Sequence, residues 1–279
     1  MIIDMRLRPP YKSLTKMNFF ETPQFIAPLV EKNGGHMPPS CFEKSMDMLI
    51  QEMDEAGVDM GVVPIRTSQG VKNEDLLELL KEYPNRFIGM AGVDPTEGLL
   101  KALDTIDEYV LNGPCAGIVM ELPFCTGGPI HVDDPLLTVI YEKCERDNVP
   151  VYLQWGGLFA PDLGLYDPIE LDHVAAKYPK MTIICGHAGW PYVTQMCQIC
   201  LCRQNVYLAP DTYMTPNTPG YEGYVKAAQN MLSDRICFST AYPLATIAET
   251  KKSFDEMPLS DEIKENIFCN NAKRALNLE

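Results

Sequence analysis

The first predicted strand carries two arginines whose spacing places both on one face. It covers residues 2–9 and reads IIDMRLRP, so Asp4, Arg6 and Arg8 point the same way along an alternating strand. A guanidinium has five donors and no acceptor; it cannot bind a metal cation, but it binds carboxylate or phosphate, often through two parallel hydrogen bonds. The alternative role is an ion pair with a carboxylate such as Asp4 or Glu121. Because two buried guanidiniums without partners are costly, we expect at least one of them to bind an anionic substrate.

One histidine stands where it could transfer a proton. His187 directly follows an apolar predicted strand, and its ordinary pKa near ~6.5 suits general acid/base catalysis at neutral pH. A purely structural histidine is the alternative interpretation. No His-x-His or His-Glu-x-x-His pattern occurs, so the usual zinc site is hard to assemble. The remaining histidines fall in predicted loops or in a helix: His36, His131 and His173.

Two carboxylates also end predicted strands. For Glu121, we expect first that it holds Arg6 or Arg8 in place and second that it transfers a proton. Asp211 could orient His187, act as a base itself, or open the following loop as an Asx-turn. These three roles stay open for Asp211.

Five further residues are candidate substrate contacts near strand ends. Trp190 is expected to line the pocket wall, and Tyr213 follows Asp211 by two residues. The hydroxyl of Tyr242 could donate to an oxyanion, or its ring could pack under the barrel rim. Thr240 and Gln154 are candidate polar contacts.

Composition restricts the class of protein. The chain has 279 residues, 46% of them hydrophobic, and a formal net charge of −15, which opposes binding to nucleic acid and to anionic membranes. No apolar run approaches the ~20 residues of a membrane span, and no signal-peptide pattern opens the sequence, so we expect a cytoplasmic protein. The ten cysteines read as reduced, buried thiols. For the closest group, Cys197, Cys200 and Cys202, burial in a helix is favoured over a metal cluster.

Strand and helix patterns alternate along the whole chain. Strands are predicted at 2–7, 60–65, 87–92, 116–121, 150–154, 182–185, 206–208 and 236–239. Helices are predicted at 40–56, 73–83, 98–112, 135–148, 168–178, 192–202, 221–232, 244–256, 260–267 and 270–277. Eight strands, each followed by a helix, favour a single (β/α)8 TIM barrel over residues 1–279, with a doubly wound open sheet as the alternative. No Gly-x-Gly-x-x-Gly follows the first strand, which argues against a dinucleotide site.

Loop lengths indicate which end of the barrel carries function. Turns into predicted strands are short, whereas several loops that leave strands are long, and barrel active sites are built from those loops. The longest is 9–40. Its aromatic residues are too many for a free linker, so we expect a lid or an oligomer contact, such as that of a homodimer: Tyr11, Phe19, Phe20 and Phe25.

Four short motifs in the same order resemble the amidohydrolase-related family. This is the branch that includes aminocarboxymuconate-semialdehyde decarboxylase and related decarboxylases and hydratases. The motifs are the opening Ile3-Asp4, ICGHAGWP at 184–191, FSTAYP at 238–243 and NNAKRAL at 270–276. The resemblance implies a (β/α)8 barrel. It also implies that His187 acts as an acid/base, which in the family stands beside a metal.

The chain departs from the family at the metal positions. Histidines usual on the first strand are replaced by Arg6 and Arg8, and a histidine usual at the end of the fifth strand is replaced by Gln154. The aspartate usual in the eighth-strand motif is replaced by Ala241. We therefore expect no bound metal and no cofactor.

Without a metal, only easier reactions are accessible. Zinc lowers the pKa of bound water from ~15.7 to ~7, about 12 kcal/mol of ionisation, whereas a general base contributes ~3–5 kcal/mol. We therefore expect a lyase acting on a small carboxylate, by decarboxylation or by hydration and dehydration, in preference to a hydrolase. Arg6 and Arg8 would bind the anion, and His187 would move the proton. The alternatives are a non-catalytic ligand-binding barrel, and a metal-dependent hydrolase with an unusual ligand set drawn from Asp4, Glu121, His187 and Asp211.

Overall fold

Seven parallel strands form one sheet in sequence order. The structure is a computed structural model that describes residues 1–157 and 161–278. Each strand pairs with the next along the chain. Nearly every strand residue is buried, as expected where both faces of a parallel sheet are covered. The strands are β1 (Ile3–Asp4), β2 (Met60–Pro64), β3 (Phe87–Gly92), β4 (Gly117–Met120), β5 (Val151–Gln154), β6 (Ile183–Gly186) and β7 (Val206–Ala209).

The predicted eighth strand at 236–239 is not a regular strand, but its segment still closes the barrel. Ile236 forms an isolated parallel bridge with Leu208 of β7. Tyr242 forms another with Leu7, which follows β1 in the chain. The backbone N–H of Met5 donates to the carbonyl of Phe238 at 2.9 Å. These contacts join the two edges of the sheet, so the TIM-barrel prediction is confirmed and the open-sheet alternative is wrong.

A physical reason explains why this eighth segment lacks strand geometry. The backbone N–H of Thr240 donates to the Asp4 carboxylate at 3.0 Å, and that of Phe238 donates to the carbonyl of Ile267 at 2.8 Å. Ala241 has a φ of +60°, which no strand accommodates. Several peptide groups of this segment therefore bond to a side chain and a helix, so its bonds to the neighbouring strands are too few for a regular strand.

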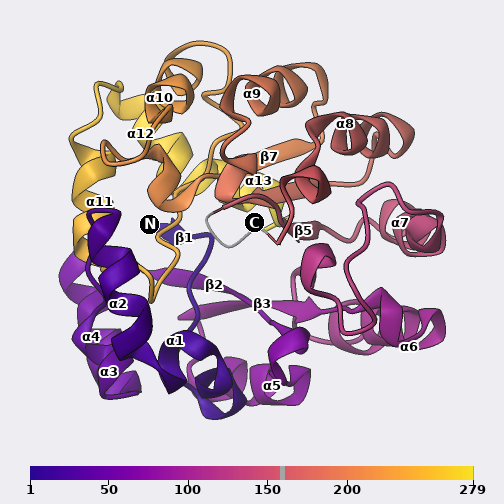
Figure 1. The fold of residues 1–279 in the computed structure, drawn as a ribbon, viewed down its shortest axis with the longest axis horizontal. Helices are drawn as coiled ribbons and strands as arrows, with labels where there is room; N and C mark the ends of the chain where they lie inside the picture. Colours follow the sequence, from indigo (N-terminus) through magenta and orange to yellow (C-terminus); the bar gives the residue numbers. More distant parts are fainter. Residues whose placement is uncertain (158–160, 279) are drawn as a thin grey trace.

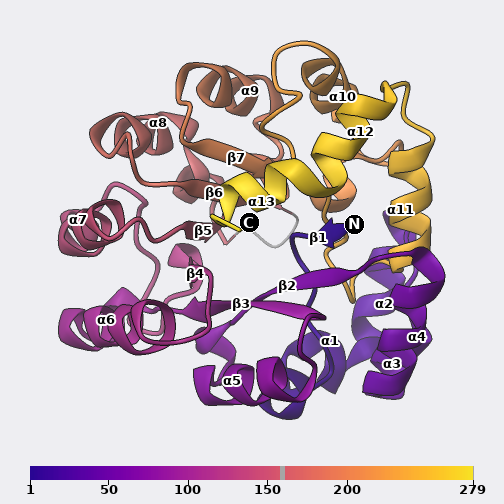
Figure 2. The ribbon, with the colours of Figure 1, turned by 180° about the vertical axis from the view of Figure 1, so that it is seen from behind.

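Helices surround the strands, as Figure 1 shows. Viewed from behind, α13 crosses the end of the barrel at which the chain begins (Figure 2). The predicted helix at 40–56 is in fact two helices, and that at 98–112 ends as a π-helix. The helices are α1 (Asn18–Glu21), α2 (Pro23–Lys32), α3 (Pro39–Phe42), α4 (Met46–Ala56), α5 (Asn73–Glu82), α6 (Leu99–Thr105), α7 (Thr138–Arg146), α8 (Pro168–Lys177), α9 (Val193–Cys202), α10 (Tyr221–Gln229), α11 (Ile247–Asp255), α12 (Asp261–Glu265) and α13 (Asn271–Ala275).

Capping residues set several of these helix boundaries. The side chain of Ser45 accepts a hydrogen bond from the backbone N–H of Met48 at the start of α4, which ends at Gly57 in the left-handed conformation. Asp167 caps α8 in the same way, ahead of Pro168 at its first position. None of the helices in the described part of the chain is long and apolar enough to span a membrane.

The inserted segment 9–40 is folded against the barrel. It contains α1 and α2 and begins with a short 3-10 helix, and Figure 1 shows α2 beside α11. Phe19 and Phe20 are buried, whereas Phe25 is 74% exposed. The burial of Phe19 and Phe20 shows that this segment packs against the protein and is not a free linker. Its role as a lid or an oligomer contact stays a prediction. All ten cysteines are free thiols, and all are buried except Cys202.

Asn271 ties the last helix to the segment that closes the barrel. Its side-chain amide is fully buried and donates to the carbonyls of Ile236 at 2.6 Å and Ser233 at 3.1 Å. The neighbouring Asn270 is only partly buried, and its amide donates to Asn266 of the same helical segment. Within the motif at 270–276, Asn271 therefore supplies hydrogen-bond donors to two backbone carbonyls in or next to the segment that closes the barrel.

We expect Asn271→Ala to lower the free energy of unfolding by about 1–3 kcal/mol, because it leaves buried carbonyls without donors. Asn270→Ala is the matched control and should change it by less than about 0.5 kcal/mol. Urea unfolding followed by circular dichroism measures both. Equal losses in the two variants would contradict the role given to Asn271.

Candidate active site

A cavity of about 590 Å³ opens at the carboxyl ends of the strands. Its walls come from strand-to-helix loops, from the inserted segment 9–40 and from the start of α11. Loops at this end of a barrel are where the sequence predicts the site. Of the ten predicted site residues, six line the cavity: Arg6, Arg8, Glu121, Gln154, His187 and Tyr213.

Arg6, Asp211 and His187 form one hydrogen-bonded cluster. Nη1 of Arg6 donates to Oδ2 of Asp211 at 2.7 Å, and Nδ1 of His187 lies 2.9 Å from the same oxygen. The Arg6 nitrogen is also 3.3 Å from Nδ1 of His187. Asp211 is fully buried; burial alone would raise its pKa, but Arg6 and His187 together lower it to about 2. It therefore stays ionised, and its contacts are those of a residue that orients the histidine.

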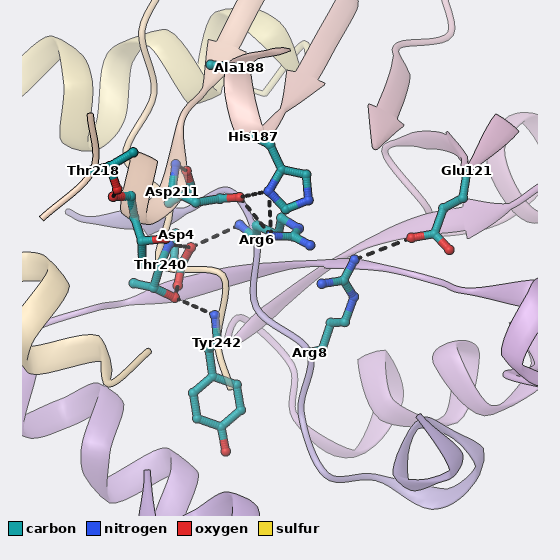
Figure 3. Close-up of polar contacts among 12 residues, drawn as sticks. Asp4, Arg6, Arg8, Glu121, His187, Ala188, Asp211, Thr218, Thr240 and Tyr242 are labelled. Carbon is teal, nitrogen blue, oxygen red and sulfur yellow. Dashed lines mark hydrogen bonds and ion pairs between the residues drawn. The ribbon is translucent and has the colours of Figure 1, made fainter. Parts of the chain in front are cut away.

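His187 is a neutral imidazole at pH 7 in this setting. Burial, and then the charge of Arg6, lower its pKa to about 4, although Asp211 acts in the opposite direction. Because the carboxylate of Asp211 accepts a hydrogen bond from Nδ1, the other ring nitrogen is left as an acceptor. Figure 3 shows that nitrogen on the side of the ring that faces Arg8 and Glu121. His187 is thus placed to accept a proton within the cavity.

Arg8 is buried at the cavity floor. Among residues 1–157 and 161–278, none accepts a hydrogen bond from its Nε, Nη1 or Nη2 atoms. The nearest carboxylate oxygen, Oε1 of Glu121, is 3.7 Å from Nη2, which is an ion-pair distance rather than a hydrogen bond (Figure 3). Burial, followed by the charges of Arg6 and Arg66, lowers the pKa of Arg8 well below its usual range. An anion in the cavity would accept hydrogen bonds from Arg8 and would raise its pKa again.

Two neutral groups on β5 share this lack of partners. Within the described part of the chain, the side-chain amide of Gln154 makes no hydrogen bond through its oxygen or its nitrogen, and the buried hydroxyl of Tyr152 makes none either. Residues two apart on a strand point to the same face, so both side chains project inward. Gln154 lines the cavity and forms its floor together with Arg8, whereas Tyr152 does not line it.

Arg66 is a third cavity-lining guanidinium that sequence reasoning missed. It is the second residue after β2. Its Nε donates to Oε2 of Glu121 at 2.6 Å, and its guanidinium lies over the ring of Phe124. Glu121 therefore contacts both Arg8 and Arg66, which agrees with the first role expected for it. Three guanidiniums face the two carboxylates of Glu121 and Asp211. The nearest charges around Arg8 are therefore two other guanidiniums and the single carboxylate of Glu121.

The structure corrects the expected substrate contacts of Thr240 and Tyr242. Thr240 lies below the cavity, where its Oγ1 donates to Oδ2 of Asp4 at 2.5 Å. The hydroxyl of Tyr242 is hydrogen-bonded to Oγ of Ser40 at 2.7 Å, so the ring packs under the rim, as the second interpretation had it. Burial raises the pKa of Asp4 to about 6, although Thr240 and backbone donors act against it. None of these three side chains lines the cavity.

Trp190 supports the cavity wall from behind instead of forming it. Its ring stacks on Tyr213 with centroids 5.1 Å apart, and its Nε1 donates to the carbonyl of Pro219 at 3.0 Å. Tyr213 is the residue that lines the cavity. Its ring is roughly perpendicular to the imidazole of His187, and the two ring centroids are 5.3 Å apart. The expected wall contact of Trp190 is therefore indirect.

Four non-glycine residues around the site have positive φ angles. They are His187 at +62°, Ala188 at +48°, Asp211 at +55° and Ala241 at +60°. This conformation is unfavourable for residues with a Cβ and clusters at functional sites in proteins. Here it turns the side chains of His187 and Asp211 toward each other.

The residues present do not fit the metal that the resemblance implies. Arg6, Arg8, Gln154 and Ala241 occupy the family's usual ligand positions, and neither guanidinium can donate an electron pair to a cation. Among the described residues, no group of three or more His, Cys, Asp or Glu side chains is placed to hold a metal ion. The alternative ligand set of Asp4, Glu121, His187 and Asp211 is thus not assembled, because Asp4 bonds to Thr240 and Glu121 to Arg66.

We expect the imidazole of His187 to titrate near pH 4 and the midpoint to rise in Arg6→Gln, which removes the adjacent positive charge. Arg8→Gln is the matched control; it should raise the midpoint less, because the charge of Arg8 has a smaller effect on this pKa than that of Arg6. Histidine NMR titration measures the midpoints. The unfolded chain binds this proton from about pH 6.5 downward, so the free energy of unfolding should fall between about pH 6.5 and 4. A midpoint unmoved by Arg6→Gln would contradict the assignment.

Comparisons with known proteins agree with the barrel fold. Residues 40–278 match the sequence model of the amidohydrolase family. The solved structure of an uncharacterised TIM-barrel protein from Bordetella bronchiseptica is 31% identical, with 99% of this chain and 98% of that chain covered and a TM-score of 0.92. No curated protein matches the chain.

Solved decarboxylases share the fold at lower identity. A 2,6-dihydroxybenzoate decarboxylase complexed with 2,6-dihydroxybenzoate is 16% identical, with 99% of each chain covered and a TM-score of 0.73. A dihydroxybenzoic acid decarboxylase from Polaromonas sp. JS666, with bound manganese and the inhibitor 2-nitroresorcinol, is 17% identical, with 99% of this chain and 96% of that chain covered and a TM-score of 0.71. From its sequence match and its barrel, this chain belongs to the amidohydrolase family.

Proposed function

We propose that this protein is an enzyme that acts on a small carboxylate without a metal ion, by decarboxylation or by hydration and dehydration. The observation that carries the proposal is the environment of Arg8. A fully buried guanidinium is costly when, among the described residues, none accepts a hydrogen bond from its three nitrogens. A substrate carboxylate at the floor would accept hydrogen bonds from Arg8 and from the amide nitrogen of Gln154, and would offset this cost.

The two arginines of the first strand have different roles in this proposal. Arg6 is already engaged by Asp211 and sits against His187, so it sets the electrostatics of the base. Arg8 has free donors and binds the anion. The same strand face thus supplies one positioning residue and one substrate-binding residue.

His187 moves the proton. In hydration, its acceptor nitrogen takes a proton from water as the oxygen adds to one carbon of the double bond, and the imidazolium then returns that proton to the adjacent carbon, which has received the electron pair of the double bond. For decarboxylation of a hydroxylated aromatic acid, it takes the proton of the ring hydroxyl and passes it to the ring carbon that carries the carboxylate. Cleavage of the carbon–carbon bond then releases CO₂ and leaves the bonding electron pair on the ring. Asp211 keeps the imidazole in the required tautomer throughout.

Lyase chemistry is favoured over hydrolysis on energetic grounds. A general base supplies about 10²–10⁴-fold in rate, which is too little for attack of water on an unactivated amide. An activated carboxylate or an unsaturated acid requires less. Two structural relatives are decarboxylases of dihydroxybenzoic acids, and this supports decarboxylation of an aromatic acid.

Metal independence is tested with protein that is purified in the presence of a chelator and shown by elemental analysis to contain no stoichiometric metal. We expect the metal-free protein to turn over a member of a panel of hydroxylated benzoates and unsaturated acids, followed by CO₂ release and by product chromatography. The physical reason is that the positions of the family's metal ligands hold arginine, glutamine and alanine. Activity that appears only after stoichiometric manganese or zinc is added would refute this part of the proposal.

The roles of Arg8 and His187 are separated by kinetics on the same substrate. Arg8→Gln should weaken substrate binding by about 10- to 150-fold, equivalent to about 1.5–3 kcal/mol, because a charge-assisted hydrogen bond is lost. His187→Gln should lower kcat by about 10²–10⁴-fold with little change in KM. Arg203→Gln, which removes a surface pair with Asp172, is the control and should leave both constants unchanged. An unchanged kcat in the His187 variant would reject its catalytic role.

A further inference from the structure

The cavity is far larger than a single-ring acid requires. A cavity of ~150 Å³ is enough to hold benzene, whereas this one measures about 590 Å³. A hydroxybenzoate held at the floor would leave most of that volume open. The shape and chemistry of the remaining part therefore bear on which carboxylate the site takes.

Polar and apolar groups are segregated along the cavity. Among the described residues, buried polar atoms that lack partners and belong to the lining occur in Arg6, Arg8 and Gln154, all at the floor. The outer part is lined by Ile26, Leu29 and Val30 of α2 and by Leu244 and Ala245 ahead of α11. It lies between α2 and α11, which Figures 1 and 2 both show side by side.

The α11 side of the outer part is polar, and its side chains are hydrogen-bonded. Glu249 pairs with His36 at 2.8 Å, and the hydroxyls of Thr250 and Ser253 donate to backbone carbonyls at 3.1 Å each. The opposite side, on α2, is aliphatic and offers Ile26, Leu29 and Val30 to a ligand.

We infer that the substrate is an amphipathic carboxylic acid with an apolar arm, whose carboxylate reaches Arg8 and whose arm lies between α2 and α11. This inference rests on the proposed function, because that function places the carboxylate at the floor. It narrows the substrate class from small aromatic acids in general to acids with an alkyl or aryl extension.

The test is calorimetric titration of the full-length, metal-free protein with benzoate and 4-ethyl-, 4-butyl- and 4-hexylbenzoate. We expect the dissociation constant to fall by up to about fourfold per added methylene that becomes buried. The matching 4-alkylbenzamides lack the charge and should bind at least tenfold more weakly than the acids at each length. Equal affinity for benzoate and for its three alkyl derivatives would overturn the inference.

Two matched variants of α2 locate the arm. Leu29 lines the cavity and is 41% exposed, whereas Phe25 on the same helix is 74% exposed and does not line it. Leu29→Asp should abolish the gain from 4-butyl substitution and leave benzoate binding within about twofold. Phe25→Asp adds the same charge to the same helix and should preserve the gain. Equal behaviour of the two variants would refute the placement of the arm.

Failure of the inference and failure of the proposed function give different results. If alkyl extension has no effect but Arg8→Gln still weakens benzoate binding at least tenfold, the arm is wrong and the carboxylate assignment stands. If Arg8→Gln binds benzoate as tightly as the unaltered protein does, the carboxylate assignment is wrong, and the inference that rests on it fails as well.

Discussion

The site depends on one buried positive charge, the guanidinium of Arg8. In a barrel interior, where the effective dielectric constant is far below that of water, such a charge is tolerated only if its surroundings compensate for lost hydration. Here compensation is partial: Glu121 stands at ion-pair distance and is itself bonded more closely to Arg66. The closed barrel holds the guanidinium in place, so its positive charge stays only partly compensated by the protein. The carboxylate that we propose as a ligand would supply the missing negative charge.

Arg6 lies on the same strand face as Arg8, but its charge is compensated and that of Arg8 is compensated only in part. Its hydrogen bond to Asp211 compensates its charge, and the same nitrogen approaches the imidazole of His187. A fixed cation beside a histidine disfavours the imidazolium, so the ring is available as a base over the whole neutral range. In the relatives implied by the resemblance, a metal ion stands beside this histidine; in this chain, a guanidinium held by a carboxylate supplies the adjacent positive charge.

Sequence patterns predict the barrel, the order of its strands and six of the residues that line the cavity. Those predictions succeed because alternation and strand-end position are local properties, and Arg6, Arg8 and His187 all stand at strand ends. Arg66 also follows a strand, but nothing local distinguishes it from an ordinary surface arginine. The directions of Thr240 and Tyr242 could not be predicted, because they are set by Asp4 and Ser40, partners more than 200 positions away in the chain. The irregular eighth segment is missed for the same reason.

The family match begins at residue 40, whereas Arg6, Arg8 and α2 all precede that position. Arg8 and the aliphatic side chains of α2 are thus encoded in one contiguous N-terminal stretch, whereas His187 and Asp211 come from a later part of the chain. A genetic exchange confined to the first 39 codons would replace that part of the cavity lining and retain both residues of the imidazole–carboxylate pair. Arg6, which bonds to Asp211, lies in the same stretch, so such an exchange would keep the pair's electrostatic setting only if it also kept this arginine.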